Sequence, residues 1–507
     1  MTVPSNHPEA GAPGTPAQRR LVLAALAFFV ASRVAVHLGL TPFFDGDSWK
    51  FLGGADALWA GEPLPPLFRD LPTIGGGLHA VPGYAWFMDV VWRLVGHVSL
   101  PAVLLAQSLV ALAGYLAAAD LARRWAGAWT GVALLVVLAT APTLLWLEHL
   151  LMPDVLGISL FWGSAWLVVQ GNRRLEVPAA LAAGVLMVGA VMLRTANDAL
   201  ILPLVALSLV VPRSMTRHLK WGGAFVFALA LGLAPWLAHN HRVHGVYRLA
   251  VSSGRHLYYS ALWSDTISRT RLAQELGMPG GDAIAQAPEL VTRVWHGLLG
   301  EGLTIPDADR EMGRRAVAAY RDQNPWTVLR QRSGLLAEFF VESEGSGQRV
   351  KPLRSAWDEV LANQQFSPAA RRWAEGYFQH RFGAESIAAQ AAAVHFNGTV
   401  VALLRWWAMI LTLDGPLLAL LALVALPGLW KVEYPVRAFL TFAAPALAAL
   451  AAFTIFGLPR YRYQVGLHPF FLATVVVGGP ALWTSLRGRM GRGRARTSAT
   501  AGRGTSC

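Results

Sequence analysis

The sequence predicts an all-α protein, a polytopic bundle of transmembrane helices that carries a mostly helical extracytoplasmic domain. Of its 507 residues, 54% are hydrophobic and only 14% are charged, whereas soluble proteins carry about 25% charged residues. The mean hydropathy is +0.41, and long apolar runs recur from Leu21 to Leu486. One long stretch, 239–395, is too polar to cross a membrane and contains helix-like segments at 309–322 and 326–341.

A transmembrane helix needs about 20 consecutive apolar residues. By length and hydropathy the candidate spans are 20–40, 99–121, 127–146, 155–170, 177–193, 199–212, 221–238, 414–430, 437–456 and 465–485. Two further apolar segments, 82–97 and 397–411, are ambiguous. Pro82 begins the first of them, and Arg405 and Trp406 lie in the second. Because tryptophan and arginine favour the membrane interface, we expect both segments to lie on the membrane surface or to re-enter it.

Basic residues set the orientation of the predicted bundle. If neither ambiguous segment counts as a span, one side of the membrane collects the basic residues of the short loops and the tail. These are Arg123, Arg124, Arg173, Arg174, the stretch 213–220, Lys431, Arg437 and the segment 487–507. Lys and Arg are enriched in cytoplasmic loops, so we expect both termini in the cytoplasm and the protein in the inner or plasma membrane. The net charge of +13 then reflects attraction to anionic membrane lipid, and no nucleic-acid partner is expected.

Acidic residues follow two apolar segments on the predicted extracytoplasmic side. Asp45 and Asp47 lie in FFDGDSWKFL, and Glu148 and Asp154 lie in LLWLEHLLMPDVLG. Carboxylates are costly in or beside hydrocarbon, so such positions are candidate functional residues. We expect the two segments to form one acidic site at the membrane surface. The alternatives are that the aspartates are turn or helix N-cap residues and that the glutamate is a surface charge at headgroup level.

Cationic side chains gather on the same predicted side. Arg194 follows the fifth span, and Arg460, Arg462 and His468 lie in the late segment PRYRYQVGLHPF. The planar arginine fork donates two parallel hydrogen bonds to phosphate, and carboxylates suit proton abstraction from a hydroxyl. A base beside an anion clamp implies a lipid-phosphate substrate, from which a polar acceptor displaces polyprenyl phosphate. The arginines could instead be snorkelling interface residues, and Arg194 could pair with Asp198.

Six short motifs occur in an order that resembles a known family. They are Gly46-Asp47-Ser48 in the first loop, His79 with Pro82-Gly83-Tyr84, Asp154 after the third span, LRTANDALILPL after the fifth, Pro235-Trp236 at the end of the seventh, and Arg460-Tyr461-Arg462 before Pro469. This order resembles the glycosyltransferase C superfamily, and more closely its branch of protein O-mannosyltransferases and lipid A aminoarabinose transferases. The resemblance covers 20–260 and 400–485.

The resemblance implies an inverting enzyme that takes its sugar from a polyprenyl-phosphate donor and gives it to an acceptor protein, lipid or glycan. It places the catalytic base on the first-loop aspartate, Asp47. Phe51 stands where the family has a tyrosine, and the second acidic role stays open between Glu148 and Asp154. Asp45 could share proton or metal duty with Asp47, and a divalent metal, Mg²⁺ or Mn²⁺, is possible in principle, although Asp-Gly-Asp alone supplies too few oxygen ligands to predict one.

Two other function classes remain open. A lipid-linked glycan flippase or transporter would use the same charges to conduct a headgroup. A non-catalytic membrane scaffold would use the polar domain to recruit partners. Many transporters are built from internal repeats, and the sequence shows none, so a glycosyltransferase is the preferred interpretation.

The predicted organisation has five parts. They are a disordered cytoplasmic N-terminus (1–18), a transmembrane catalytic module (19–238) with extracytoplasmic loops at 41–98 and 147–154, an extracytoplasmic, mostly helical domain (239–395), C-terminal transmembrane helices (396–486) and a basic cytoplasmic tail (487–507). The active site is expected on the extracytoplasmic side of this module.

Overall fold

The computed structural model describes residues 15–39, 48–61, 81–170, 176–251, 253–278, 287–340, 399, 402–403, 406–407, 410, 415–456 and 461–501. Every regular element within these ranges is a helix, so the predicted all-α class is confirmed. Asp45, Asp47, His79 and Arg460 lie outside the described residues. The same is true of most of the second ambiguous segment and of the second half of the polar stretch.

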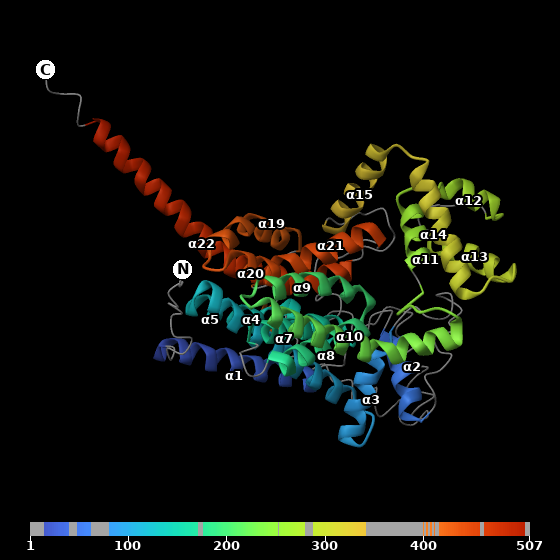
Figure 1. The fold of residues 1–507 in the computed structure, drawn as a ribbon, viewed down its shortest axis with the longest axis horizontal. Helices are drawn as coiled ribbons and strands as arrows, with labels where there is room; N and C mark the ends of the chain where they lie inside the picture. The colour runs from blue at the N-terminus through green and yellow to red at the C-terminus, as the bar shows by residue number, and fades with distance from the viewer. Residues whose placement is uncertain are drawn as a thin grey trace.

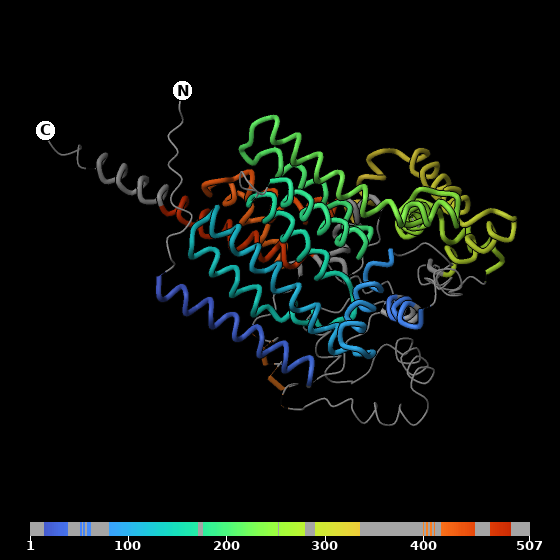
Figure 2. The backbone as a smooth tube through the Cα atoms, turned by 60° about the horizontal axis from the view of Figure 1, so that its bottom comes forward, coloured from blue at the N-terminus to red at the C-terminus, as the bar shows by residue number. Residues whose placement is uncertain are grey.

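The bundle is built from long and short apolar helices (Figure 1). They are α1 (Pro16–Gly39), α4 (Leu100–Ala126), α5 (Ala128–Thr140), α6 (Pro142–His149), α7 (Asp154–Gln170), α8 (Glu176–Leu193), η2 (Thr195–Leu200), α9 (Ile201–Val210), α10 (Met215–His244), α19 (Gly415–Ala425), η4 (Leu426–Lys431), α20 (Pro435–Ala438), η5 (Phe439–Ala443), α21 (Ala444–Phe456) and α22 (Tyr461–Ala501). Figures 1 and 2 both show α1 running beside α4 and α5.

Five helices are long and apolar enough to cross a membrane, namely Pro16–Leu38, Leu100–Ala126, Glu176–Leu193, Met215–His244 and Leu467–Arg487. α5 and α6 together form a sixth such segment, bent by 53° at the break between them. The shorter apolar helices are Asp154–Gln170, Thr195–Val210, Leu417–Lys431 and Pro435–Ala451. Each segment predicted to span therefore overlaps an apolar helix, and the chain is a multi-pass membrane protein.

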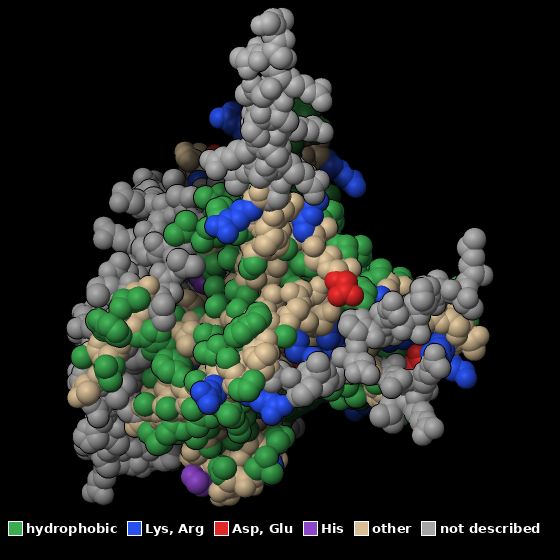
Figure 3. Space-filling view, turned by 90° about the vertical axis from the view of Figure 1, so that its left-hand side faces the viewer, with side chains coloured by type: hydrophobic (Ala, Val, Ile, Leu, Met, Phe, Trp, Pro, Cys, Tyr) green, Lys and Arg blue, Asp and Glu red, His purple; other side chains and the backbone are tan. Residues whose placement is uncertain are grey.

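The bundle has two chemically different ends. α1 begins and α22 finishes at one end of the bundle. At the other end lie α2 (Ser48–Trp59), α3 (Gly83–Val95) and the helices of residues 253–340 (Figure 1). We call the first the basic end, marked by Arg19, Arg123, Arg217 and Arg487, and the second the site end. Figure 3 looks onto the basic end and shows Lys and Arg side chains among hydrophobic ones, with few Asp or Glu. Arg123, Arg217 and Arg487, which the sequence places on one side of the membrane, therefore lie at one end of the bundle.

α3, which covers most of the first ambiguous segment, lies across the site end (Figure 1). It buries one face that includes Tyr84, Met88 and Trp92 against the bundle. At its start a Cβ on Gly83 would lie 2.3 Å from the carbonyl oxygen of Met192, so only glycine allows this close approach between α3 and the end of α8. The first ambiguous segment is therefore a docked helix of 13 residues, too short to span the bilayer.

The described part of the polar stretch after α10, residues 253–340, contains a small group of helices beside the site end. Its helices are α11 (Ser253–Trp263), α12 (Arg269–Glu275), α13 (Ala287–Gly300), α14 (Ile305–Arg321) and α15 (Pro325–Phe340), and the last two confirm the helix-like segments predicted there. Its core contains Leu262, Trp295 and Met312. The buried Asp309 accepts hydrogen bonds from the backbone N–H groups of Gly254 and Arg255 at the start of α11 (3.2 and 2.9 Å).

Buried and exposed charges behave differently in this domain. Burial lowers the pKa of Arg255 to about 10 even though Asp309 acts in the opposite direction. On the surface of α14, hydrogen bonds from Arg314 and Arg315 lower the pKa of Glu311 to about 2.

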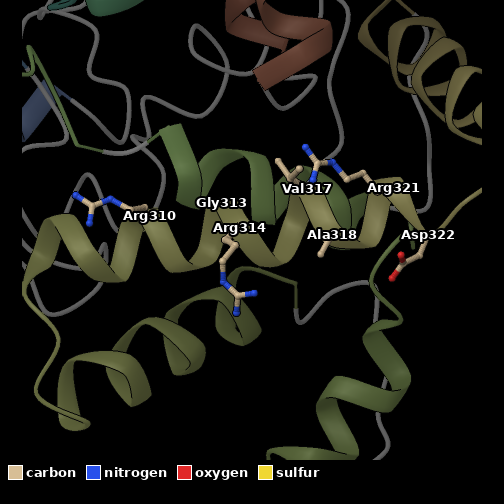
Figure 4. Close-up of a pocket in the computed structure, with 7 residues that line it drawn as sticks. All are labelled: Arg310, Gly313, Arg314, Val317, Ala318, Arg321 and Asp322. Carbon is tan, nitrogen blue, oxygen red and sulfur yellow. The ribbon is translucent and has the colours of Figure 1, made fainter.

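The same surface carries a hollow of about 540 Å³ (Figure 4), lined by Arg310, Gly313, Arg314, Val317, Ala318, Arg321 and Asp322. Arg310 and Arg314 pair with acids of their own helix, which is typical of a solvated helix face.

Candidate functional site

A salt bridge at the site end joins two of the predicted site residues. Asp154 is the first residue of α7, and Arg194 directly follows α8. Their side chains form an ion pair that is only partly accessible, with 8% and 19% of the side-chain surface exposed. Asp198 is exposed in η2, so the alternative partner considered for Arg194 is not the one that the structure shows. An acidic and a cationic candidate thus meet at one point.

The turn that carries Arg194 is held closely against α7. Asn197 donates from its side-chain amide to the carbonyl of Ala190 at 2.7 Å. A Cβ on Gly157 would lie 2.3 Å from that same amide nitrogen, so a larger residue on the facing turn of α7 would force the Asn197 side chain to move. These contacts fix the distance between the start of α7 and the end of α8, which positions the ion pair.

Glu148 lies inside the bundle and is fully buried. Arg33 of α1 donates hydrogen bonds to both of its carboxylate oxygens, at 2.8 and 3.0 Å. The hydroxyl of Tyr115 donates to the same carboxylate at 3.0 Å. A further guanidinium nitrogen of Arg33 donates to the carbonyl of Ala139 at 2.6 Å. The interpretation of Glu148 as a surface charge at headgroup level is therefore wrong, because its charge is neutralised within the protein.

A histidine pair lies next to this ion pair. His37 follows Arg33 by one helical turn, and its Nδ1 lies 2.8 Å from Nδ1 of His149, the residue after Glu148. The other ring nitrogen of His37 lies 2.9 Å from the hydroxyl of Ser108. α1 and α6 are therefore joined by two adjacent polar links inside an apolar bundle.

Sequence reasoning did not single out Arg33 and His37. Both lie within the first apolar span at positions i and i+4, which share one face of a helix. Ionisable residues inside a span almost always face the bundle interior and mark functional regions. That signal was present in the sequence, but it does not say which residue they pair with.

The amide of Gln107 on α4 connects the two halves of the site end. Its oxygen accepts a hydrogen bond from the hydroxyl of Tyr84 at 2.9 Å, and its nitrogen donates to carbonyls of the α6–α7 turn. The ring of Tyr84 packs edge-on against Phe51 of α2, with centroids 5.2 Å apart. α2 begins at Ser48, directly after Asp47, so the helix that follows the first acidic segment is tied to the turn that carries the second.

The start of α22 provides the remaining candidates. Arg462 lies in its first turn, but the side chain is outside the described part of the structure. His468 is 99% buried, and neither of its ring nitrogens has a hydrogen-bond partner in the described part of the chain. Phe470 packs against Phe161 and Trp162 of α7, with ring centroids 5.7 and 5.3 Å apart. α22 therefore contacts the same helix that begins with Asp154.

No group of three or more His, Cys, Asp or Glu side chains that could hold a metal ion occurs among the described residues. The only cysteine is Cys507, which leaves no disulfide within one chain. The described part of the site end is therefore a set of ion pairs and amide contacts.

Comparisons with known proteins give structural similarity alone. No protein-family model matches the sequence, and no curated protein matches it. Among solved structures, ArnT from Cupriavidus metallidurans bound to undecaprenyl phosphate is similar over 92% of this chain and 79% of its own, with 15% identity and a TM-score of 0.38. The oligosaccharyltransferase AglB from Archaeoglobus fulgidus, solved with an inhibitory peptide and a dolichol phosphate, is similar over 95% of this chain and 52% of its own, with 11% identity and a TM-score of 0.46. These values assign no residue and no activity to this chain.

The Asp154–Arg194 pair leads to a prediction about stability. We expect a double-mutant cycle with Asp154→Asn and Arg194→Gln to give a coupling free energy of about 1–3 kcal/mol, because each single variant breaks a partly buried, charge-assisted hydrogen bond. The unfolding free energy measured in mixed micelles checks this value.

The matched control is the Asp89–Arg93 pair on α3, whose arginine side chain is 54% exposed. Its aspartate is 13% exposed, but an ion pair with a solvent-exposed arginine contributes about 0–1 kcal/mol, so Asp89→Asn with Arg93→Gln should give the smaller coupling. Equal coupling for the two pairs would contradict the role assigned to the Asp154–Arg194 contact.

Proposed function

We propose that the protein is an integral membrane glycosyltransferase that transfers a sugar from a polyprenyl-phosphate donor to an extracytoplasmic acceptor with inversion. The observation that supports this proposal is that the turn before Asp154 is linked at the site end to α2, the helix that follows Asp47. Asp154 pairs with Arg194 there, and the α6–α7 turn is tied through Gln107 and Tyr84 to the helix that follows Asp47. A carboxylate beside a cation at the lipid boundary suits chemistry on a lipid phosphate.

The reaction assigns a separate task to each group. Asp47 accepts the proton of the acceptor hydroxyl while the hydroxyl oxygen forms a bond to the anomeric carbon. The bond from that carbon to the phosphate oxygen breaks, and its electron pair leaves with polyprenyl phosphate. Attack opposite the leaving group inverts the anomeric centre. Asp45 lies two residues before Asp47 and is assigned a supporting acidic role.

The donor phosphate is assigned to the cationic candidates. Arg460 and Arg462 stabilise the charge that develops on the leaving phosphate, and Arg194 contributes from α8 with its guanidinium oriented by Asp154. A buried imidazole without a hydrogen-bond partner is costly, and a phosphate oxygen would satisfy His468. Glu148 is satisfied by Arg33 and Tyr115, which supports a structural role and leaves the second acidic role to Asp154.

The test of the function is a donor panel. Purified protein is incubated with a set of polyprenyl-phosphate sugars, and release of free polyprenyl phosphate is measured for each. We expect one donor to be consumed when acceptor is present. Movement of a fluorescent lipid-linked glycan between vesicle leaflets with its phosphate bond intact, and no consumption of any donor, would instead identify a flippase.

Donor binding gives a further prediction. We expect Arg460→Ala to raise the apparent KM for the donor by about tenfold or more, because a hydrogen bond to a charged group contributes about 1.5–3 kcal/mol. Steady-state kinetics with the consumed donor measure this effect. Arg487→Ala at the basic end serves as control, and an unchanged KM in the Arg460 variant would contradict the assignment.

A further inference from the structure

The C-terminal end of α6 lies inside the protein, where its last carbonyl groups need hydrogen-bond donors from another element. This helix has eight residues and bends away from α5 by 53°. The last four carbonyls of a helix have no intrahelical donor, and buried carbonyls without a donor are costly where water is excluded. Leu147, Glu148 and Leu150 are all buried, so the end of α6 must obtain its hydrogen bonds from another element.

Gln107 of α4 supplies those hydrogen bonds. Its side-chain nitrogen lies 3.2, 3.1 and 3.0 Å from the carbonyl oxygens of Leu147, Glu148 and Leu150. The amide has two hydrogens, so the three carbonyls share them. Gln107 is fully buried, and it acts as a side-chain cap that α4 provides for α6. The turn beyond it is tight, because the N–H of Met152 also donates to the carbonyl of Leu150 at 2.8 Å.

The opposite side of the same amide fixes its orientation. Tyr84 donates its hydroxyl hydrogen to the amide oxygen at 2.9 Å, and burial raises the pKa of Tyr84, so that hydroxyl keeps its proton. The amide oxygen must therefore face Tyr84, and the NH₂ group must face the carbonyls. Because the Tyr84 ring packs on Phe51, one glutamine touches the end of α6 directly and α2 through one intermediate residue.

We propose that Gln107 is a positioning residue that holds the turn before Asp154 in register with the helix after Asp47. In the described part of the chain it acts through Tyr84 and the Leu147–Leu150 carbonyls. The inference rests on the proposed function for its effect on catalysis, whereas its structural part can be measured without any substrate. A misplacement of about 1 Å by a residue away from the chemistry can cost about 100-fold in rate.

The first experiment compares two glutamines. Gln107→Met keeps the volume and removes the amide, and Gln170→Met does the same at the basic end, where Gln170 donates to Asp120 at 3.4 Å. We expect kcat to fall about 10- to 100-fold in the Gln107 variant, while the donor KM changes less than about threefold. Equal kcat in the two variants, or a loss confined to KM, would overturn the proposal.

The second experiment needs no turnover. Cys507→Ser removes the only native thiol, and Met152→Cys places a new one in the buried turn, where Met152 is 3% exposed. We expect Gln107→Met to speed alkylation of this thiol at least about tenfold, because the loss of buried hydrogen bonds favours local opening. Gln170→Met should leave the rate unchanged. Identical alkylation rates with native Gln107, with Gln107→Met and with Gln170→Met would overturn the proposal.

Further outcomes separate the two proposals. If the wild-type protein consumes no donor but Gln107→Met still accelerates alkylation, the proposed function fails and the structural role of Gln107 stands. If Gln107→Met does not fold, Tyr84→Phe replaces it, since it removes one hydrogen bond and leaves the carbonyl contacts in place. Tyr84→Phe should give an intermediate rise in alkylation, and no rise would count against the proposal.

Discussion

Asp47→Asn is expected to abolish sugar transfer while the protein remains folded and inserted in the membrane. A positioned general base contributes about 10²–10⁴ to the rate, and asparagine keeps the size of the side chain but cannot take a proton. The measurement is turnover of a labelled polyprenyl-phosphate sugar by purified variant, with folding monitored by size-exclusion chromatography. Asp47 follows the first span and directly precedes Ser48, where α2 begins.

The control for this variant is Asp89→Asn, which removes a carboxylate from the same end of the bundle. Asp89 pairs with an arginine of its own helix and has no assigned part in the reaction. It should therefore turn over donor at the wild-type rate. Retained turnover in the Asp47 variant would contradict its assignment as the base.

Glu148→Gln is expected to destabilise the fold by about 3–5 kcal/mol, because it leaves the buried guanidinium of Arg33 without a counter-charge. The amide would still accept from Tyr115, but it carries no negative charge. Denaturation in mixed micelles measures the change in unfolding free energy. A variant within about 1 kcal/mol of wild type would show that the pair carries little coupling.

The double variant Arg33→Leu with Glu148→Leu separates structure from chemistry. Replacing both members of a buried ion pair by apolar residues is often neutral or stabilising, so we expect this variant to recover most of the lost stability. If it also turns over donor, the second acidic role belongs to Asp154. If it is stable but inactive, Glu148 takes part in the reaction.

The transmembrane spans were predictable from the sequence because the backbone cannot hydrogen-bond to water inside the lipid bilayer. A segment in hydrocarbon must satisfy its own hydrogen bonds, so long apolar runs become helices. The segment at 82–97 was predicted to lie on the membrane surface or to re-enter the membrane, and the structure shows a helix of 13 residues packed on the bundle. Its first residues contain Pro82 and Gly83, and the glycine proves necessary where α3 contacts the backbone of Met192.

The break at Pro142 was harder to predict. The sequence from 127 to 146 reads as one apolar span, but proline removes a backbone donor and favours the start of a new helix. The structure divides the segment into α5 and α6 with a bend of 53°. That bend brings Glu148 and His149 to α1, where Arg33 and His37 hold them.

Partners in the site could not be predicted, because pairing across the bundle depends on packing. Glu148 and Arg33 are 115 residues apart in the chain, and hydropathy says nothing about which helices meet. For Arg194 the sequence offered the nearby Asp198 as an alternative partner to the donor phosphate. The structure instead shows Asp154, which α7 brings to the end of α8. Gln107 was not among the candidate site residues, because a single glutamine in an apolar span forms no recognisable motif.

The most direct test of the central claim is sidedness, because the proposed reaction needs both acidic segments on one non-cytosolic face. Single cysteines at Asp47, His97 and Asp198 and one at Thr216 of the basic end are introduced into a Cys507→Ser background and labelled with a membrane-impermeant thiol reagent in intact cells. We predict labelling at positions 47, 97 and 198, and labelling at 216 only after permeabilisation. Positions 47 and 198 reacting from opposite sides of the membrane would contradict the account.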